Sequence, residues 1–469
     1  MAGYFLTKNN NKFKELEKNI YNDFPIYKSI RNIGKDKWNV LFFQKINIED
    51  NNIFKDGNNF IIGVGSYVYK GNIGGRALED IYNDYIKNKF IFREVLGHFN
   101  FILFINNKIS IITDKVGYYF SYQANENNDV VYSTSLSLLT SYLDNIEYSK
   151  QEMLEYINVA STFGGNTIFK NIKHTQPGVY IDLNSKLEEK YFNIEIKKVS
   201  FNNYIKKVNN YFSQFEKIER KIGADLSGGF DTRTIASALL NSKVKFNFLT
   251  NDRPKSVSKD KEVAISIAKK VNKRISVIPL EYQFDNKSVS DKEIIKKLEA
   301  ARGLDILKRV FNEIQNKSQD HEVIIGGWGA EMLRNQHGRF KNVRELVKGY
   351  GYHRVSLGYE KDIVYKKNIE NKLNYLYDIK NNSKASIGEL AFYLEKGKYW
   401  AGSVLSARNK YAFWVVPFFD PELSLDLLSL NSKGNSLQNK VIVNLYSRFN
   451  TIPYGNIDTE KQIVTKFKG

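Results

Sequence analysis

The chain has 469 residues, of which 70 are Lys or Arg and 51 are Asp or Glu; its formal net charge is +19, and 42% of its residues are hydrophobic. This composition excludes a disordered chain. At roughly 100 to 200 residues per domain the length predicts two or three domains, each large enough to bury its own core. Cysteine is absent, which excludes disulfides, thiolate zinc sites, iron–sulfur ligation and a cysteine nucleophile.

The basic excess does not by itself indicate a nucleic-acid binder. Its lysines are spread along the chain, and neither a zinc finger nor an RNP-type aromatic motif occurs, whereas nucleic-acid binding usually shows a concentrated basic stripe. The first residues lack the apolar core of a signal peptide, and no apolar span reaches about 18 residues. We therefore expect a soluble, cytoplasmic protein with a solvated Lys-rich surface, and neither a nucleic acid nor a membrane as its partner.

The first part of the chain is predicted to be mainly β. Residues 38–43, 60–69 and 99–105 show the period of two that is typical of half-buried strands. Asn106-Asn107 supplies a turn, after which the alternation resumes, so a hairpin is predicted there. Residues 179–183 form a further short strand after a Pro-Gly turn.

Beyond residue 200 short apolar strands alternate with helices. A helix is expected from about residue 231, and a second one follows the next strand. This alternation predicts a parallel sheet covered on both faces, with a mostly helical remainder from about residue 330. The strands are predicted at residues 222–226, 244–248, 275–278 and 323–325.

The change in pattern divides the chain into two predicted domains. Residues 1–190 form the first and residues 205–469 the second. Residues 191–204 are expected to be a linker, because the charged stretch at residues 184–198 is typical of a connection between domains.

The most informative segment is Ala-Asp-Leu-Ser-Gly-Gly-Phe-Asp-Thr-Arg at residues 224–233. A strand that ends in Ser-Gly-Gly and leads directly into a helix leaves backbone N–H groups where an anion can approach closely, which predicts a phosphate cradle. The hydroxyls of Ser227 and Thr232 are suited to donate to phosphate, and Asp231 to hold Mg²⁺. The alternative is an ordinary turn capped by Asp231.

Two other phosphate-binding classes are excluded. No GxxxxGK[ST] occurs, so the segment is not a Walker A loop. The same string contains the LSGG of ABC-type ATPases, but such a protein needs a Walker A loop as well.

The segment is similar to the SGGxDS pyrophosphate loop of the N-type ATP pyrophosphatases, and the chain resembles the asparagine synthetase and β-lactam synthetase family. Further similarities follow the family's order and cover nearly the whole chain. They are residues 96–101 with 113–117 (the GxFAF…DrlG hairpins of the glutaminase-type domain), 325–333 (the SGEGxDE loop), 416–420 (R-x-PFLD), and 439–441 with 452–453 (K-x-ilR…lP).

The resemblance implies an α/β multidomain fold. The first domain would be a layered α+β domain of the Ntn type (αββα), as in class II glutamine amidotransferases. The second would be a parallel-sheet domain of the adenine nucleotide α-hydrolase type, the ATP-pyrophosphatase domain, with a helical C-terminal part. Its implied cofactors are ATP and Mg²⁺.

One departure from the family concerns glutaminase activity. Glutamine-using members begin Met-Cys-Gly, and the exposed cysteine attacks the glutamine amide, whereas this chain begins Met1-Ala2-Gly3. Since alanine has no nucleophilic atom, the first domain is predicted to be inactive as a glutaminase, as the resemblance implies for β-lactam synthetases too.

Other departures fall in the loop at residues 325–333 and just after it. Trp328 replaces the family's glutamate and has no acid–base capacity, so another group must act as the base; Glu360 is the candidate, against a solvated loop charge. Glu331 replaces the aspartate that binds Mg²⁺ and is predicted to bind it together with Asp231. Arg334 follows where the family usually has a Phe-Gly pair, which predicts a pocket reshaped for another substrate, against a surface or structural salt bridge.

The family also uses a lysine near the C-terminus to stabilise charge on the acyl-adenylate transition state. This chain offers Lys461, Lys466 and Lys468. Lys461 is the preferred catalytic candidate, against the alternative of a frayed basic tail.

The nucleotide site is expected at the carboxyl edge of the predicted sheet. Leu249 and Thr250 end the second strand there and are predicted to meet adenine, whereas Asp260 and Glu262 are predicted to cap the helix that follows. The residues predicted to bind the nucleotide are Leu226, Ser227, Gly228, Gly229, Phe230, Asp231, Thr232, Leu249, Thr250 and Gly327.

The leading functional hypothesis is a Mg²⁺-dependent ligase that adenylates a carboxylate with ATP, releases pyrophosphate, and lets an amine or ammonia displace AMP. Its partners would be a small-molecule or peptide carboxylate and an amine or ammonia donor; a homodimer stays open. The alternative is a non-catalytic relative, a scaffold or regulatory protein that keeps the fold. A tRNA-modifying pyrophosphatase is disfavoured by the missing cysteines and by the glutaminase-like first domain.

Overall fold

The computed structural model describes residues 3–20, 27–48, 52–87, 92–126, 129–159, 161–252, 259–279, 313, 316–335, 337–351, 363–381, 383, 385–430 and 434–452. Within these ranges, the structure has no helix with both the length and the apolar character that a bilayer crossing requires.

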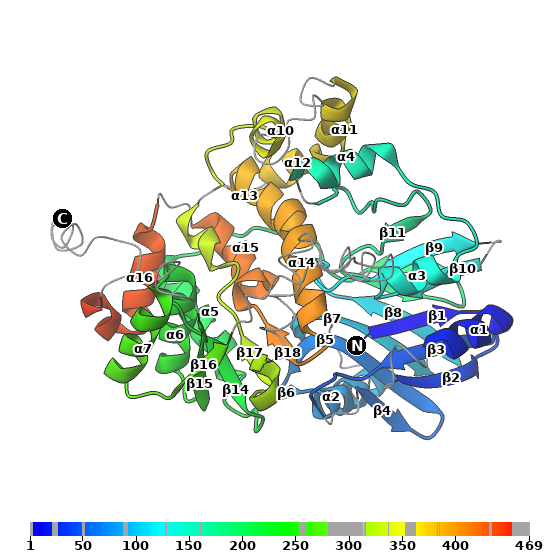
Figure 1. Ribbon diagram of the computed structural model, residues 1–469, viewed down its shortest axis with the longest axis horizontal. Helices are drawn as coiled ribbons and strands as arrows, with labels where there is room; N and C mark the ends of the chain where they lie inside the picture. The colour runs from blue at the N-terminus through cyan, green and yellow to red at the C-terminus, as the bar shows by residue number, and fades with distance from the viewer. Residues whose placement is uncertain are drawn as a thin grey trace.

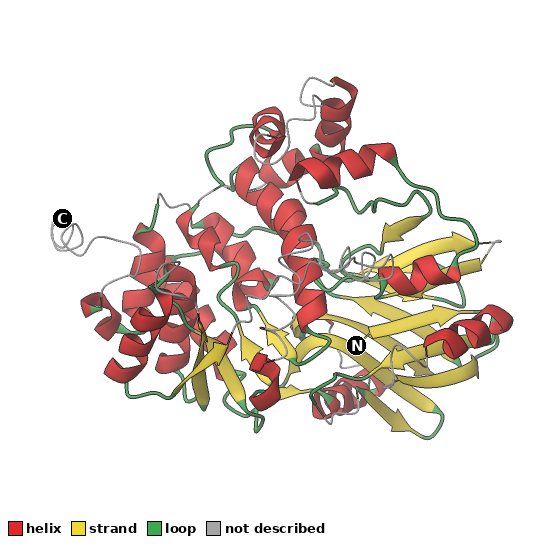
Figure 2. Ribbon diagram, in the orientation of Figure 1, coloured by secondary structure: helices red, strands yellow, loops and turns green. Residues whose placement is uncertain are grey.

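Two antiparallel sheets form the N-terminal half (Figures 1 and 2). The first has the order β11 (Ile172–His174), β9 (Tyr122–Glu126), β10 (Asp129–Ser133), β1 (Gly3–Thr7), β3 (Trp38–Phe43), β2 (Tyr27–Ile33). The second has the order β13 (Leu187–Lys190), β12 (Val179–Asp182), β8 (Lys108–Thr113), β7 (Leu96–Ile105), β5 (Asn59–Tyr69), β4 (Ile53–Asp56), with β6 (Asn72–Ile73) paired to β5.

The facing sides of the two sheets enclose one apolar core, which includes Leu6, Phe42 and Ile102. Helices cover the outer sides. They are α1 (Asn10–Ile20), α3 (Leu136–Tyr142) and α4 (Lys150–Val159), together with α2 (Gly75–Ile86). The buried face of α2 joins a core with β5 and β7, while α1 and α3 share a core with β1 and β3. The layering is therefore αββα, and the predicted fold class is confirmed for this half.

The hairpin between β7 and β8 follows directly from its sequence. Asn106 and Asn107 both have positive φ, at 50° and 63°, which asparagine tolerates better than most residues and which a two-residue hairpin turn requires. Alternate residues of β7 face opposite cores, Phe101 on one side and Ile102 on the other. Because both faces are covered, residues 101–105 of the strand form a continuous apolar run.

The C-terminal half contains a five-stranded sheet in which every pair is parallel. Its order is β16 (Ile275–Pro279), β15 (Phe246–Asp252), β14 (Ile222–Asp225), β17 (Val323–Ile325), β18 (Phe413–Val415). The residues of β17 are 0% exposed, so this strand is covered on both faces. The parallel sheet predicted from alternating strands and helices is confirmed.

Helices surround this sheet and continue beyond it (Figure 1). α5 packs on α6, and α7 packs on β15. α14 runs between the two halves of the molecule. The elements are α5 (Phe201–Ser213), α6 (Phe230–Asn241), α7 (Asp260–Lys270), α10 (Val343–Gly351), α11 (Ile363–Leu373), α12 (Leu376–Asn381), α13 (Ile387–Ala391), α14 (Gly397–Arg408), α15 (Pro421–Ser429) and α16 (Ser436–Leu445), with short turns η1 (Phe92–Glu94), η2 (Ala330–Arg334), η4 (Phe392–Lys396), η5 (Pro417–Phe419) and η6 (Ser447–Thr451).

The two halves are joined by buried polar contacts. The ammonium of Lys45 donates to the carbonyl of Ala412 at 3.2 Å, and the hydroxyl of Tyr118 donates to the carbonyl of Tyr393 at 2.7 Å. The ammonium of Lys372 lies 2.9 Å from a carboxylate oxygen of Glu152. Burying donors and charges is favourable only when they are paired, so these contacts fix the relative position of the halves.

An aromatic box at the same interface contains a histidine. The ring of His174 lies 4.6 Å from Phe120, 4.7 Å from Tyr122 and 4.9 Å from Tyr399, measured between centroids. Burial lowers the pKa of His174 to about 3, and the positive charge of Lys398 acts in the same direction. The imidazole is therefore neutral in the folded protein at physiological pH.

This pKa predicts acid sensitivity. Between about pH 6.5 and pH 3 the unfolded chain binds a proton at His174 that the folded chain does not, so the free energy of unfolding falls as the pH falls through this window. Urea denaturation at pH 7 and at pH 5 gives the drop in the free energy of unfolding on acidification. We expect this drop to be smaller for His174→Phe and His174→Gln than for the wild type. An unchanged loss in both variants would contradict the prediction.

Candidate active site

The loop between β14 and α6 is held closed by its own hydroxyl groups. The amide N–H of Ser227 donates to Oγ1 of Thr232 at 2.9 Å, and the two hydroxyl oxygens lie 3.0 Å apart. The amide N–H of Gly229 donates to Oγ of Ser227 at 3.2 Å. Both hydroxyls predicted to contact phosphate thus bond inside the loop and shape it.

A carboxylate from the neighbouring helix reaches the same loop. The amide N–H of Gly228 donates to Oδ1 of Asp260, the first residue of α7, at 2.9 Å. An anion therefore already lies against one of the amides that a phosphate would use. The prediction that Asp260 and Glu262 cap α7 is wrong, because the N-cap is Lys259 and no side chain caps the helix. The contact of Asp260 with the loop depends on how α7 is placed beside it, which no local pattern encodes.

Asp231 lies in the first turn of α6 and connects three elements. Its Oδ2 accepts from Nη2 of Arg334 in η2 at 3.0 Å, and its Oδ1 accepts from Nε2 of Gln438 in α16 at 2.9 Å. The alternative that Asp231 caps the helix is wrong, because the N-cap is Gly229 and no side chain caps it. Burial raises the pKa of Asp231, with Arg334 and Gln438 opposing.

Glu331 lies close enough to Asp231 for their charges to interact. Burial and the charge of Asp231 raise the pKa of Glu331 to about 7. Two adjacent carboxyl groups of this kind fit a cation, since each would be stabilised by one. Among the described residues, however, no group of three or more histidine, aspartate or glutamate side chains is arranged to hold a metal ion. The Mg²⁺ role of this pair stays a prediction.

Gly327, in the loop after β17, touches the backbone of α6. A Cβ atom built there would lie 2.8 Å from the amide nitrogen of Thr232 and 2.9 Å from the carbonyl carbon of Asp231. Real Cβ atoms do not come this close to backbone, so only glycine lets the two loops pack together. Its predicted contact with nucleotide is untested, but its packing role is visible.

Trp328 turns towards α14 instead of presenting an acid–base group. Its ring stacks with Trp400 at 6.1 Å, and the guanidinium of Arg408 lies 4.1 Å from the Trp328 ring and 4.3 Å from that of Trp414. An arginine between two indoles is a favourable cation–π arrangement. The tryptophan that replaces the family's glutamate thus anchors the loop to α14.

A buried ion cluster lies beside these rings. The ammonium of Lys317 lies 2.8 Å from Asp225, which ends β14, and 2.6 Å from Glu313; Arg408 lies 3.7 Å from Glu313. Burial alone would raise the pKa of Glu313, but the two cations lower it to about 2. The sequence did not indicate these residues, because none of them belongs to a motif. Lys317 is 92 residues from Asp225 and 4 residues from Glu313 in the chain.

The residues predicted to meet adenine are largely enclosed. Leu226 is 2%, Leu249 0% and Thr250 3% exposed, and the amide N–H of Leu226 donates to the carbonyl of Leu249 at 2.8 Å. The Leu249 side chain packs against Gly223. Any contact of these positions with a nucleotide must therefore come mainly from backbone atoms.

Two catalytic candidates lie outside the described residues: Glu360 and Lys461. Lys466 and Lys468 do so as well. Their predicted roles remain predictions.

No protein-family model matches the chain. No curated protein matches its sequence either. Solved structures do match in part, at low similarity. A glutamine phosphoribosylpyrophosphate amidotransferase from B. subtilis, complexed with ADP and GMP, has a TM-score of 0.28 and 8% identity over 63% of this chain and 70% of its own.

Two other solved structures match with TM-scores of 0.20. A U34-tRNA thiolase from Methanococcus maripaludis is 13% identical over 53% of this chain and 73% of its own. An NMN synthetase from Francisella tularensis is 14% identical over 54% of this chain and 94% of its own. Likenesses this weak carry no argument, so the fold and the site rest on the geometry above.

Gly327 gives a direct test of the packing between the two loops. We expect Gly327→Ala to lower the free energy of unfolding by about 2 kcal/mol, because the added methyl overlaps the backbone of α6. Gly229→Ala is the matched control, since its Cβ would meet only Oγ of Ser227 at 3.4 Å and its φ is −83°. Equal urea midpoints for Gly327→Ala and wild type would contradict this packing role.

Proposed function

We propose that the chain is an AMP-forming enzyme that uses ATP to adenylate a substrate carboxylate and then forms an amide. The observation that carries the proposal is the Ser-Gly-Gly loop at the carboxyl end of β14, which leads into α6 with Asp231 in its first turn and Glu331 beside it. The carboxyl edge of a parallel sheet and the N-terminus of a helix both favour a phosphate-bearing ligand.

In the proposed reaction, the carboxylate oxygen of the substrate attacks the α-phosphorus of ATP and pyrophosphate leaves. The loop amides of residues 227–229 would hold the departing pyrophosphate, with Arg334 adding positive charge at the same place. An amine or ammonia then attacks the acyl carbon and AMP leaves with the bonding electrons. Catalysis would come mostly from positioning and charge stabilisation.

Mg²⁺ is part of the proposal. Asp231 and Glu331 would hold it, and it would neutralise phosphate charge. The proposed nitrogen source is free ammonia, an amine substrate or a partner protein, because the chain has no cysteine for thiolate glutaminase chemistry.

A second candidate, a non-catalytic relative, is favoured by one feature of the same site. Three loop amides already bond to side chains of the chain itself, and both oxygens of Asp231 are engaged by Arg334 and Gln438. These internal bonds stabilise the site without a ligand, as expected of a protein that keeps the fold but does not bind ATP. Nucleotide binding and pyrophosphate exchange separate the two candidates.

The first test is ATP–pyrophosphate exchange across a panel of carboxylates. We expect one or more carboxylates to support exchange, and Asp231→Asn to reduce it by about 100-fold, or about 2.7 kcal/mol, because a charged group beside the phosphates is lost. Asp144→Asn is the matched control, since its side chain is 60% exposed in the other half. Undiminished exchange in Asp231→Asn would remove the assigned role, and absence of any ATP binding would favour the non-catalytic candidate.

The second test concerns the carboxylate that already lies in the cradle. We expect Asp260→Ala to bind ATP about fivefold more tightly, because one loop amide is freed and a negative charge is removed, at a gain of about 1 kcal/mol. Asp260→Asn keeps an acceptor but not the charge, so its ATP affinity should lie between those of the wild type and Asp260→Ala. Calorimetry measures both. Weaker binding by Asp260→Ala would mean that this carboxylate shapes the loop for ATP instead of competing with it.

A further inference from the structure

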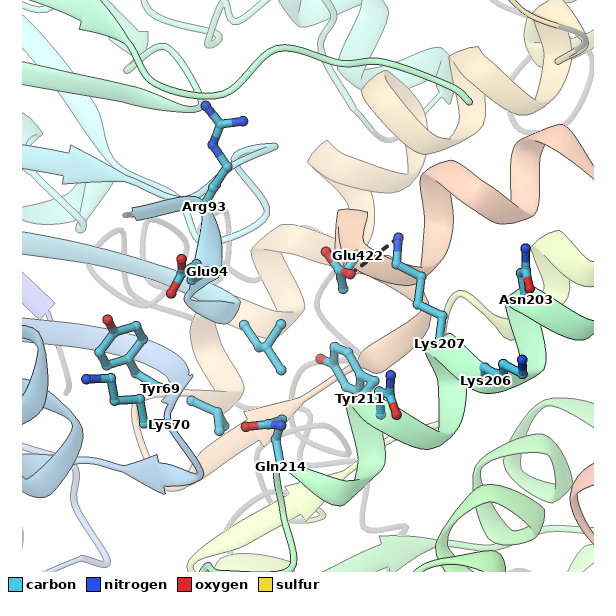
Figure 3. A pocket seen from close by; sticks show the side chains of 13 residues that line it. Tyr69, Lys70, Arg93, Glu94, Asn203, Lys206, Lys207, Tyr211, Gln214 and Glu422 are labelled. Carbon is cyan, nitrogen blue, oxygen red and sulfur yellow. Dashed lines mark ion pairs between the residues drawn. The ribbon is translucent and has the colours of Figure 1, made fainter. Parts of the chain in front are cut away.

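Lys398 is a buried cation at the junction of the two halves. Most other cations there are exposed: a wide cleft of about 750 Å³ is lined by several, among them Arg93 and Lys206 (Figure 3). These two side chains point apart from opposite walls, so they define no common ligand position. Lys398 differs from them, because it is only 8% exposed and lines a small, separate cavity.

This small cavity lies between α14 and the first half of the chain. Lys398 and Tyr399 follow Gly397, the first residue of α14. The other lining residues come from the first half and are Thr113, Gly117, Tyr119, Phe120, Ser121, His174, Thr175, Gln176 and Pro177. The volume is about 10 Å³, which is about the space that one water molecule or one monatomic ion needs.

No carboxylate balances the ammonium of Lys398 at short range. Among the described residues it forms no ion pair, and Glu395 and Asp114 act on it only over a longer distance. Both carboxylates are engaged elsewhere, since Glu395 accepts from the hydroxyl of Tyr375 at 2.6 Å and Asp114 from the amide N–H of Tyr119 at 2.8 Å. Because burying a charge is costly unless it is paired, the ammonium favours an anion in the adjoining cavity.

The side chain of Lys398 keeps its charge in this position. Burial would lower the pKa of Lys398, but Tyr399 and the carboxylate of Glu395 raise it overall. The ammonium lies 4.4 Å from the centroid of the Tyr399 ring, which adds a cation–π contact. The cavity is therefore bordered by a permanent positive charge.

His174 provides a second donor in the lining. Its imidazole is neutral and so carries one N–H, and its side chain has no hydrogen-bond partner in the described part of the chain. The charge of Lys398 lowers the pKa of His174, so the two side chains lie within electrostatic range of each other. The lining residues include neither aspartate nor glutamate. The chemistry of this lining suits an anion and disfavours a cation.

We propose that the cavity binds a single small monovalent anion, such as chloride, which Lys398 holds between the two halves. The N–H of His174 is the second donor. A monatomic anion fits, whereas the volume leaves no room for a phosphate or an organic carboxylate. Because the anion contacts α14 and the first half together, its binding stabilises the folded chain. The proposal does not depend on the adenylation reaction.

Urea denaturation of the full chain in mixtures of sodium chloride and sodium gluconate at constant ionic strength tests the proposal, because gluconate is too large for the cavity. We expect chloride to raise the ratio of folded to unfolded chain in a saturable way, about tenfold at ten times its Kd. Lys398→Met should abolish this effect, whereas Lys190→Met, which removes an exposed lysine, should retain it. Equal stability of the wild type in the two salts, or an equal chloride effect in the two variants, overturns the proposal.

Bromide locates the anion directly, since it replaces chloride in such sites and gives an anomalous X-ray signal. Crystals of the wild type soaked in sodium bromide should show an anomalous peak beside Nζ of Lys398. This measurement needs no variant, so it holds even where Lys398→Met fails to fold. Ordered water without an anomalous signal overturns the proposal. A bromide peak without any chloride effect in solution does so too, because it reflects binding at crystal concentration only.

Discussion

The candidate site depends on the contacts that the carboxylate of Asp231 makes with Arg334 and Gln438. Through Arg334 and Gln438 this carboxylate connects the first turn of α6 to η2 and to α16, elements that are 103 and 207 residues away in the chain. Gln438 is 0% exposed and also donates to the carbonyl of Ala330 at 3.1 Å. Gln438 is buried, whereas the side chains of Arg334 and Asp231 are 25% and 34% exposed, so the contact with Gln438 contributes most to holding the three elements in one arrangement.

This arrangement sets the charge balance around the phosphate loop. Asp231, Glu331 and Asp260 bring three carboxyl groups, and Arg334 brings a cation that pairs with Asp231. Burial and the neighbouring charge of Asp231 raise the pKa of Glu331 to about 7. An incoming nucleotide would therefore need a cation, or would have to displace Asp260, before its phosphates reach the amides.

Much of the fold was predictable because its signals are local. The period of two in residues 60–69 and 99–105, the paired asparagines at the hairpin, and the glycines after β14 each act within a few residues. The helices of the first half were implied by the resemblance but not located along the chain, because strand alternation is the dominant local signal there. In the site, Asp231 and Glu331 were found through a motif, whereas Gln438, Lys317 and Arg408 were not, since their roles arise only when distant elements meet.

The tryptophan at position 328 links the site to the rest of the molecule. Its ring packs on Arg408 and Trp400, and both belong to α14. The same helix contacts the first half, where Oγ of Ser406 accepts from the amide N–H of Phe120 at 3.0 Å and Tyr399 lies against His174. The loop after β17, helix α14 and the first half of the chain are thus in continuous contact. The first half therefore has a physical role in the candidate site, because it supports the helix on which the loop after β17 rests.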